Sequence, residues 1–323
     1  MRHFLFGVFI LTQLVCFGQI SDDFSDLDFT SNPTWAGSNA DYIVNGSEQL
    51  QLNSAAAGTS YLSLTHNFSD LNNKEWQFWT RQAFSPSANN FGRIYLTSDN
   101  ADLTTDPNGF YLQLGESLSN DAVRLFKCDG GTHTELAAGP LGQISTSFII
   151  SIRVVRDNLG GWSLYVDPAG GTNFGLVGSA TDAANLLGTH SGVLNVYTSG
   201  NVDNFYYDDV YIGDEIVDVT PPVLVSATAI NANLVDLLFD EALDQASAET
   251  IGNYVFNPTL AVSSITLDGT NPALVHIVPS ASLANGQNYD VTTTGIADVA
   301  LNMSGAQTES FAFLIAETPV PGD

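Results

Sequence analysis

The stretch Trp76-Gln77-Phe78-Trp79-Thr80-Arg81-Gln82-Ala83-Phe84 decides the fold. Its large apolar side chains Trp76, Phe78 and Phe84 fall on one face of an extended chain, because successive side chains of a strand point to opposite sides. Gln77 and Arg81 fall on the other face. Alternation of this kind predicts a strand with one buried face and one face toward solvent.

A second stretch, Phe148 to Arg156, repeats the pattern with Ile150, Ile152 and Val154 on one side and polar residues between them. Short alternating runs continue through residues 20–217, separated by clusters of Gly, Asn, Asp, Ser and Pro. Ten runs are strand candidates: Gln49–Leu52, Tyr61–Leu64, Trp76–Phe84, Arg93–Thr97, Phe110–Gly115, Ala122–Cys128, Phe148–Arg156, Trp162–Asp167, Gly192–Thr198 and Asn204–Ile212. This pattern predicts an antiparallel all-β sandwich over residues 20–218.

Helices are expected to be few, because no segment keeps an apolar period of 3.6 residues over the length that a stable helix needs. Asp182 to Leu187 is the expected place for a short helical turn. Two consecutive prolines, Pro221 and Pro222, mark a boundary, since proline cannot donate a hydrogen bond to a sheet and keeps the chain extended.

A second, smaller β domain is predicted over residues 219–316, the size of an immunoglobulin-like sandwich. Its seven strand candidates are Val223–Ile230, Leu234–Phe239, Tyr254–Asn257, Val262–Asp268, Leu274–Pro279, Tyr289–Thr294 and Ser310–Ala316. The last of these is apolar on both faces, which predicts a central strand. Ser247 to Thr250 can form one helical turn, and residues 317–323 are rich in Pro and read as a linker.

The first 19 residues have the features of a secretory signal peptide. A basic start at Arg2 precedes the apolar run Phe4 to Val15, and cleavage is expected next to Gln19. We therefore predict a protein that is secreted or held at the cell surface. Cleavage would leave Cys128 as the single thiol, so the sequence predicts neither an intrachain disulfide nor a cysteine metal site.

The charge is strongly and unevenly negative. The chain has 8 Lys and Arg against 35 Asp and Glu, which gives a net charge of −27. All the basic residues lie at or before Arg156, whereas residues 157–323 carry 20 acids and no Lys or Arg. Nucleic acid and anionic membrane surfaces are therefore not expected as partners, because no basic surface is present to bind phosphates.

Two groups of motifs carry a family resemblance. The stretches Phe239–Asp244, Ser247–Glu249, Asn253-Tyr254, Gly286–Val291 and Gly295–Asp298 resemble the SbsA-type bacterial Ig-like domain. The stretches Asp22–Asp26, Tyr95–Leu103 and Phe205–Gly213 are similar to the concanavalin-like sandwiches that begin secreted Bacteroidetes surface proteins. The resemblance implies a concanavalin-like β-sandwich followed by an Ig-like β-sandwich, as in lamin-tail-domain-containing proteins, and it supplies no catalytic residues.

A glycoside hydrolase would need paired carboxylates on one face of a strand. None of the predicted strands of the first domain has such a pair. The carboxylates Glu75, Glu116, Asp121 and Glu135 fall near turns and are expected to be solvated loop acids. The sequence therefore predicts that the protein is not an enzyme, although a polysaccharide-degrading glycoside hydrolase remains an alternative.

Carbohydrate binding is supported by the number of aromatic rings in the first domain, because sugars stack on exposed rings. Alternation places Trp79 opposite Trp76 and Phe78, on the same side as Arg81. Trp79 and Arg81 are therefore the candidate ligand-binding residues, with core packing of such rings as the competing interpretation. We predict a non-catalytic binding or adhesion module for extracellular polysaccharide or other surface proteins, with the Ig-like domain as a spacer. A purely structural cell-surface spacer is a further alternative.

A structural calcium ion is also expected. Asp22 and Asp23 begin the first domain and Asp208 lies near its end, and the two ends of a sandwich often lie close together. Carboxylate and carbonyl oxygens are the ligands that calcium takes. Asp99 and Asp102 offer a competing loop site, and solvated turn acids are the simpler interpretation of both groups.

Overall fold

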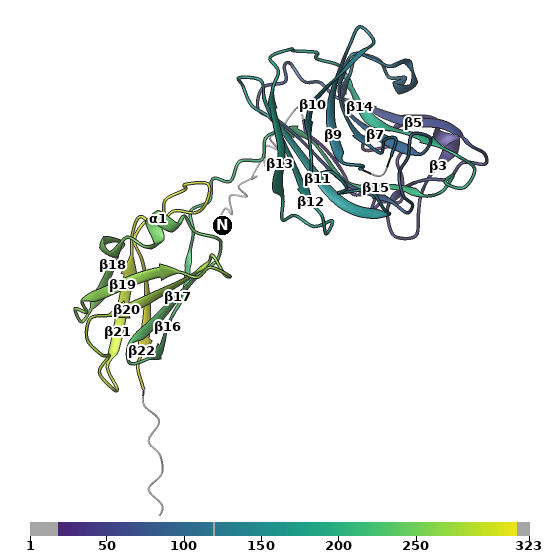
Figure 1. Ribbon diagram of the computed structural model, residues 1–323. Coiled ribbons are helices and arrows are strands. Elements are labelled where there is room, and N and C mark those ends of the chain that lie inside the picture. Colours follow the sequence, from purple (N-terminus) through teal and green to yellow (C-terminus); the bar gives the residue numbers. More distant parts are fainter. Residues whose placement is uncertain (1–18, 119, 315–323) are drawn as a thin grey trace, which may run out of the picture. The chain divides into compact units, whose positions relative to one another are not determined.

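The computed structural model describes residues 19–118 and 120–314. The chain divides into two compact units, one ending at Ile216 and one beginning at Val217 (Figure 1). The predicted signal peptide, Gln19 apart, and the predicted C-terminal linker lie outside the described residues. None of the helices in the described part is long and apolar enough to cross a membrane.

The first unit consists of two antiparallel sheets, as the alternation predicted. The larger sheet has the order β13-β12-β11-β6-β15-β4-β3, with β1 paired to β15, and the other has the order β10-β9-β8-β7-β14-β5-β2. The strands of the larger sheet are β1 (Ile20–Asp22), β3 (Tyr42–Val44), β4 (Leu50–Leu52), β6 (Lys74–Gln82), β11 (Phe148–Arg156), β12 (Gly161–Asp167), β13 (Gly175–Thr181) and β15 (Phe205–Asp214). Those of the other are β2 (Ala36–Gly37), β5 (Gly58–Thr65), β7 (Phe91–Ser98), β8 (Gly109–Leu114), β9 (Val123–Asp129), β10 (Thr132–Ala138) and β14 (His190–Tyr197).

All ten predicted strands are present, and the all-β fold is confirmed. The sequence missed β1, β2, β3, β10 and β13, which are short or carry few apolar residues. The predicted helical turn at Asp182–Leu187 is wrong. These residues form an irregular loop, in which the Asp182 carboxylate accepts a hydrogen bond from the Ala184 amide and pairs with Lys127. The short helices lie elsewhere, at η1 (Asn39–Asp41) and η2 (Leu103–Thr105).

The core of the first unit lies between the two sheets. Along β6, Trp76 and Phe78 are buried, and Trp76 stacks on Trp162 of β12 with their ring centroids 5.9 Å apart. Phe110 of β8 reaches the same cluster from the other sheet, 4.4 Å from the Trp162 ring. Burial of such large rings supplies the packing that a sandwich without disulfides needs. The opposite face of β6 is thereby turned away from the core.

The second unit is a smaller sandwich of two sheets. Its strands are β16 (Leu224–Asn231), β17 (Leu234–Phe239), β18 (Tyr254–Asn257), β19 (Val262–Leu267), β20 (Leu274–Pro279), β21 (Asn288–Thr293) and β22 (Gln307–Ala312). They form the sheets β16-β17-β20-β19 and β18-β21-β22 around a core that includes Leu237, Ile277 and Val291. Each of the seven predicted strands overlaps one of these.

The last strand is not central, contrary to the prediction. Strand β22 lies at the edge of its sheet and pairs only with β21 among the described strands. Phe311 faces the core, but the residues alternating with it are polar or small and stay exposed, so the strand needs no cover on its second face. The helical turn is present as α1 (Gln245–Ala248), where the Asp244 carboxylate accepts from the Ser247 amide and caps the N-terminus, and η3 (Ile251–Asn253) follows.

Candidate functional site

The solvent face of β6 carries the candidate ligand-binding residues. Gln77, Trp79 and Arg81 point away from the core and are half-buried, in alternation with the buried residues of the same strand. Strands β15 and β11 flank β6 on its two sides. The predicted orientation of Trp79 agrees with the structure.

Trp79 lies between Asp208 of β15 and Ser151 of β11 in the register of the sheet. It lines a hollow of about 320 Å³, which we call the Trp79 hollow, together with Gln77, Ser151 and Asp209 among others. Gly170 and Gly171, in the loop after β12, also line this hollow, and Gly170 lies close to the indole.

Gly170 makes that approach possible. Its φ is +71°, and a Cβ there would stand 2.9 Å from the Trp79 Nε1 and 2.7 Å from the Ile149 Cγ2. Both the backbone conformation and the lack of space therefore require glycine at this position. The loop that Gly170 belongs to fixes one edge of the indole.

Arg81 lies one row along the sheet, between Tyr206 of β15 and Ile149 of β11. Its guanidinium carbon is 4.7 Å from the centroid of the Tyr206 ring, a cation–π contact. It forms no salt bridge within the described part of the chain.

Arg81 lines a different hollow from Trp79, one of about 740 Å³ that also includes Gln143 and Ser147. Pro168 and Ala169 line the Arg81 hollow, whereas Gly170 and Gly171 line the Trp79 hollow. Trp79 and Arg81 thus share a face of the sheet but sit in neighbouring hollows with one loop between them.

A β-bulge next to Trp79 connects this face with the acidic residues. The register between β15 and β6 shifts between Asp208 and Tyr211, and Asp209 takes a φ of +46° there. Asp209 lines the Trp79 hollow and also a hollow of about 390 Å³ bordered by Asp22 and Asp23. The two regions that the sequence singled out are therefore adjacent.

The residues predicted to bind metal lie around this bulge. Burial, and then the neighbouring carboxylates of Asp209, Asp23 and Asp22, raise the pKa of Asp208 to about 6. Asp22 is buried, and its two carboxylate oxygens accept hydrogen bonds from the Trp35 Nε1 at 2.8 Å and the Phe24 amide at 3.0 Å.

These three predicted ligands are not a compact group. Among the described residues, one group of three acids brings its carboxylate oxygens within 4.8 Å of one another. Asp22, Asp23 and Asp208 are not that group. The acids of the competing loop site, Asp99 and Asp102, accept hydrogen bonds within their own loops. Asp99 accepts from Asn108, and Asp102 accepts from the Thr104 amide at 3.0 Å.

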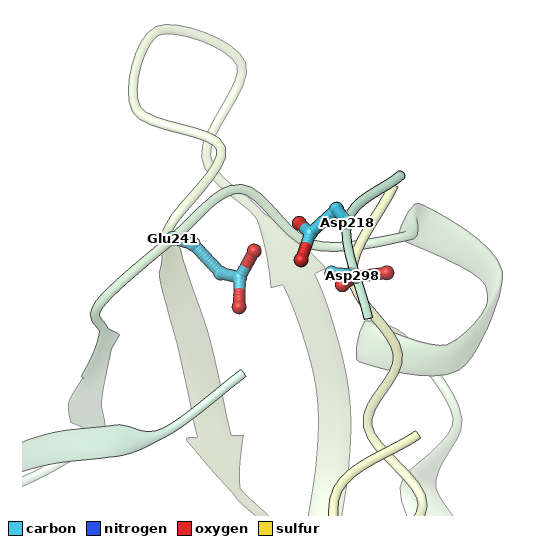
Figure 2. A group of neighbouring side chains, drawn as sticks. All are labelled: Asp218, Glu241 and Asp298. Atoms are coloured by element: carbon cyan, nitrogen blue, oxygen red, sulfur yellow. The ribbon is translucent and has the colours of Figure 1, made fainter. Parts of the chain in front are cut away.

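A compact acidic group occurs in the second unit, at residues that the sequence analysis did not single out. Asp218, Glu241 and Asp298 bring their carboxylate oxygens within 4.8 Å of one another (Figure 2). They come from the segment before β16, the residues after β17 and the loop before β22. Oxygens bound to one calcium ion at 2.3–2.6 Å are at most about 5 Å apart, so this spacing and the oxygen ligands would suit a hard cation.

Asn302 donates hydrogen bonds to two of these three residues. Asp298 is fully buried and accepts hydrogen bonds from both the amide and the Nδ2 of Asn302, each at 2.8 Å. The Asn302 Nδ2 also donates to the main-chain oxygen of Asp218 at 3.0 Å. Burial and the charges of Asp218, Asp298 and Asp240 raise the pKa of Glu241. No spacing in the sequence relates these positions, because three separate loops supply them.

Two of the carboxylates expected to be solvated are buried instead. Glu75 and Asp121 are fully buried. Glu75 accepts from the Arg153 Nη2 at 2.8 Å, from the Ile216 amide at 3.2 Å and from the Gln77 side chain. The prediction failed because Glu75 lies inside β6, where a partner on the adjacent strand compensates its charge. These contacts describe a structural ion pair.

Comparisons with known proteins give no family for this chain. No protein-family model matches the chain, and no curated protein matches it. Among solved structures, the Emp47p carbohydrate recognition domain is similar at 14% identity and a TM-score of 0.46, covering 62% of this chain and 96% of that one. The VIP36 exoplasmic/lumenal domain in its Ca²⁺- and mannose-bound form gives 13% identity and a TM-score of 0.44, covering 64% and 94%.

A part of this chain is also similar to a bacterial S-layer protein. The N-terminal part of the bacterial S-layer protein SbsC is similar at 21% identity and a TM-score of 0.28, covering 29% of this chain. The match spans only 24% of that S-layer chain.

Proposed function

We propose that this chain is a non-catalytic, carbohydrate-directed binding module that acts outside the cell. In this proposal the first unit meets an extracellular polysaccharide, and the second unit is an Ig-like spacer of a bacterial surface protein. The observation that carries the proposal is Trp79, a tryptophan on the solvent face of β6 that lines a hollow together with polar groups.

The chemistry of the Trp79 hollow suits a sugar. The carbon-bound hydrogens of a pyranose make an apolar face that can stack on the indole, and its hydroxyls both donate and accept hydrogen bonds. Gln77, Ser151 and Asp209 place an amide, a hydroxyl and a carboxylate around the same hollow. An apolar ring with a few polar groups around it is the composition expected of a ligand site.

The test is binding of the full mature chain to laminarin, xylan and alginate, measured by affinity electrophoresis and calorimetry. Trp79→Ala should weaken binding at least about tenfold, since loss of one stacking ring removes a large part of the contact. Tyr61→Ala is the matched control, because Tyr61 is a half-buried aromatic residue on the other sheet. Equal binding by wild type and Trp79→Ala would contradict the proposed site.

The same samples separate the alternatives. Release of reducing ends from any of the three polysaccharides would favour a glycoside hydrolase and contradict the non-catalytic proposal. Retention of none of them by the wild-type chain would favour a structural spacer instead.

Structural calcium remains part of the proposal. Asp22, Asp23 and Asp208 are the ligands predicted in the first unit, and Asp218, Glu241 and Asp298 would supply oxygens in the second. Millimolar calcium, compared with EDTA, should raise the Tm of a unit that binds it, and magnesium should raise it less because it resists dehydration. Asp23→Ala and Asp208→Ala test the first group and Glu241→Gln the second. Identical melts in calcium and EDTA would end this part of the proposal.

A further inference from the structure

A fourth hollow lies at the end of the first unit where β11 ends and β6 begins. Arg156, the last residue of β11, pairs in register with Lys74, the first residue of β6. The hollow has a volume of about 290 Å³ and is bordered by Asp70, Asn72, Arg156, Asn158 and Asn185, with Leu159 at its rim. We call it the Arg156 pocket. It shares no lining residue with the Trp79 and Arg81 hollows.

Arg156 is buried without a charged partner. The residue is 3% exposed, and its buried Nε has no hydrogen-bond partner among the described residues. The Nη1 donates to the Asn72 Oδ1 at 3.2 Å and to the Asp157 main-chain oxygen at 3.4 Å. An incompletely bonded buried cation is costly, and it is unusual in a chain with 35 acids.

Other basic residues of the first unit do find carboxylates. Salt bridges in the described structure involve Lys74, Arg93, Arg124, Lys127 and Arg153, and leave out only Arg81 and Arg156. Arg81 has the Tyr206 ring beside it. The guanidinium carbon of Arg156 lies 5.7 Å from the centroid of the ring of Trp162, which is buried in the core.

The acids nearest to Arg156 are engaged elsewhere. The Asp157 carboxylate accepts from the amides of Leu159 and Gly161, both at 2.7 Å. The Asp182 carboxylate pairs with Lys127. Asp70 borders the pocket but makes no salt bridge with Arg156, and its Oδ1 accepts from the Asn72 amide at 2.8 Å. The guanidinium therefore keeps donor capacity for a ligand in the pocket.

We propose that the Arg156 pocket binds a sugar acid of the hexuronate class. The planar guanidinium suits a carboxylate, with which it forms paired hydrogen bonds. The Asp70 carboxylate and the amides of Asn72, Asn158 and Asn185 can bond the hydroxyls that such a ligand also carries. A volume of about 290 Å³ is small for a ligand site and suits a single sugar unit. This inference does not rest on the proposed function of the Trp79 hollow.

The experiment compares three probes on the full mature chain at constant ionic strength. Glucuronate carries both the carboxylate and the hydroxyls, glucose lacks the carboxylate, and acetate lacks the hydroxyls. Calorimetry and tryptophan fluorescence report binding, the latter because Trp162 lies under Arg156. Glucuronate should bind at least about tenfold more tightly than either of the other two. Equal binding of glucose and glucuronate, or no binding of glucuronate, would overturn the proposal.

Variants locate the site. Arg156→Met should weaken glucuronate binding at least about tenfold, and it should fold, because it removes a buried charge that has no ion-pair partner. Arg124→Met is the matched control, since it removes one positive charge from a salt bridge outside the pocket. Asn185→Ala alters an exposed side chain of the pocket and gives a second test that does not depend on the core. Unchanged affinity in both Arg156→Met and Asn185→Ala would place any binding elsewhere.

Discussion

The two units of this chain neutralise buried carboxylates in different ways. In the first, the fully buried Glu75 meets the guanidinium of Arg153. The second contains no Lys or Arg, and its fully buried Asp298 is bonded by the amide groups of Asn302. His276 lies between the half-buried carboxylates of Asp236 and Asp268 in the same unit. Neutral donors are therefore enough to bury an acid in the second unit. In the first unit, by contrast, the buried Arg156 has no carboxylate partner.

The largest expected effect is that of Glu75→Gln. The substitution leaves Arg153 without its buried partner, and we expect a loss of about 3 kcal/mol in the free energy of unfolding, at the low end for a broken buried pair because Arg153 still reaches water. All four tryptophans lie in the first unit, so their fluorescence in a urea titration reports that unit alone.

The matched control is Glu135→Gln, in the pair with Arg124, where the Glu135 side chain is 43% exposed. That change should cost no more than about 1 kcal/mol. Similar losses in the two variants would show that burial does not distinguish these pairs.

Asp298→Asn is expected to have a smaller effect. The amide keeps the shape of the carboxylate and loses one of its two hydrogen bonds to Asn302, but it relieves the repulsion with Asp218 and Glu241. In EDTA, we expect the free energy of unfolding of the second unit to change by no more than about 1 kcal/mol. Calorimetry measures this change, because the unfolding transition of the second unit is the one that tryptophan fluorescence does not report. A loss as large as that of Glu75→Gln would remove the contrast between the two units.

Much of the fold follows from local sequence, because period-two alternation such as that of Trp76 and Phe78 reports one buried face directly. The same rule placed Trp79 on the solvent side of β6. It missed β10 and β13, whose exposed residues carry little apolar signal and whose pairing depends on neighbouring strands. The last strand, β22, lies at the edge and not at the centre, because the apolar pattern of a strand does not show which strands it pairs with.

The sites were less predictable than the strands. Asp209 lines the Trp79 hollow at a bulge in β15, and Gly170 approaches the indole from the loop after β12. The Arg156 pocket depends on three loops that are far apart in the sequence. Such encounters are set by tertiary packing, which no residue spacing records.

The stability of the second unit is expected to depend on pH through His276. Asp236 and then Asp268 raise its pKa above the ordinary value of 6.5 through hydrogen bonds to the imidazole. A raised folded-state pKa stabilises the fold fully below the unfolded pKa, and the stabilisation is lost as the pH rises through the folded one. We therefore expect a higher Tm for the second unit at pH 6 than at pH 8.5, by an amount equivalent to less than about 1 kcal/mol because the imidazole is partly exposed.

His276→Gln isolates the contribution of the imidazole. The variant should show a smaller difference between pH 6 and pH 8.5 than the wild type. An unchanged difference would assign the whole pH dependence to other groups.

The smallest expected effect is that of salt on the second unit. The second unit, residues 217–323, carries 12 Asp and Glu and no Lys or Arg, so no lysine or arginine relieves the repulsion within it. Sodium chloride should raise the Tm of this unit up to a few hundred millimolar, by roughly 2–4 °C, because the Debye length falls to about 10 Å at 0.1 M.

The first unit provides the internal comparison, since salt screens its ion pairs as well as its repulsions and should shift its Tm less. The measurement is a calorimetric scan of the full chain in EDTA, which removes divalent cations, with an uncharged osmolyte as the control for general stabilisation. Repulsion between acids responds to ionic strength, whereas an osmolyte leaves the ionic strength unchanged and acts on both units through exclusion from the protein surface. A flat or falling Tm in salt would mean that neutral donors such as those of Asn302 already compensate the acids of the second unit.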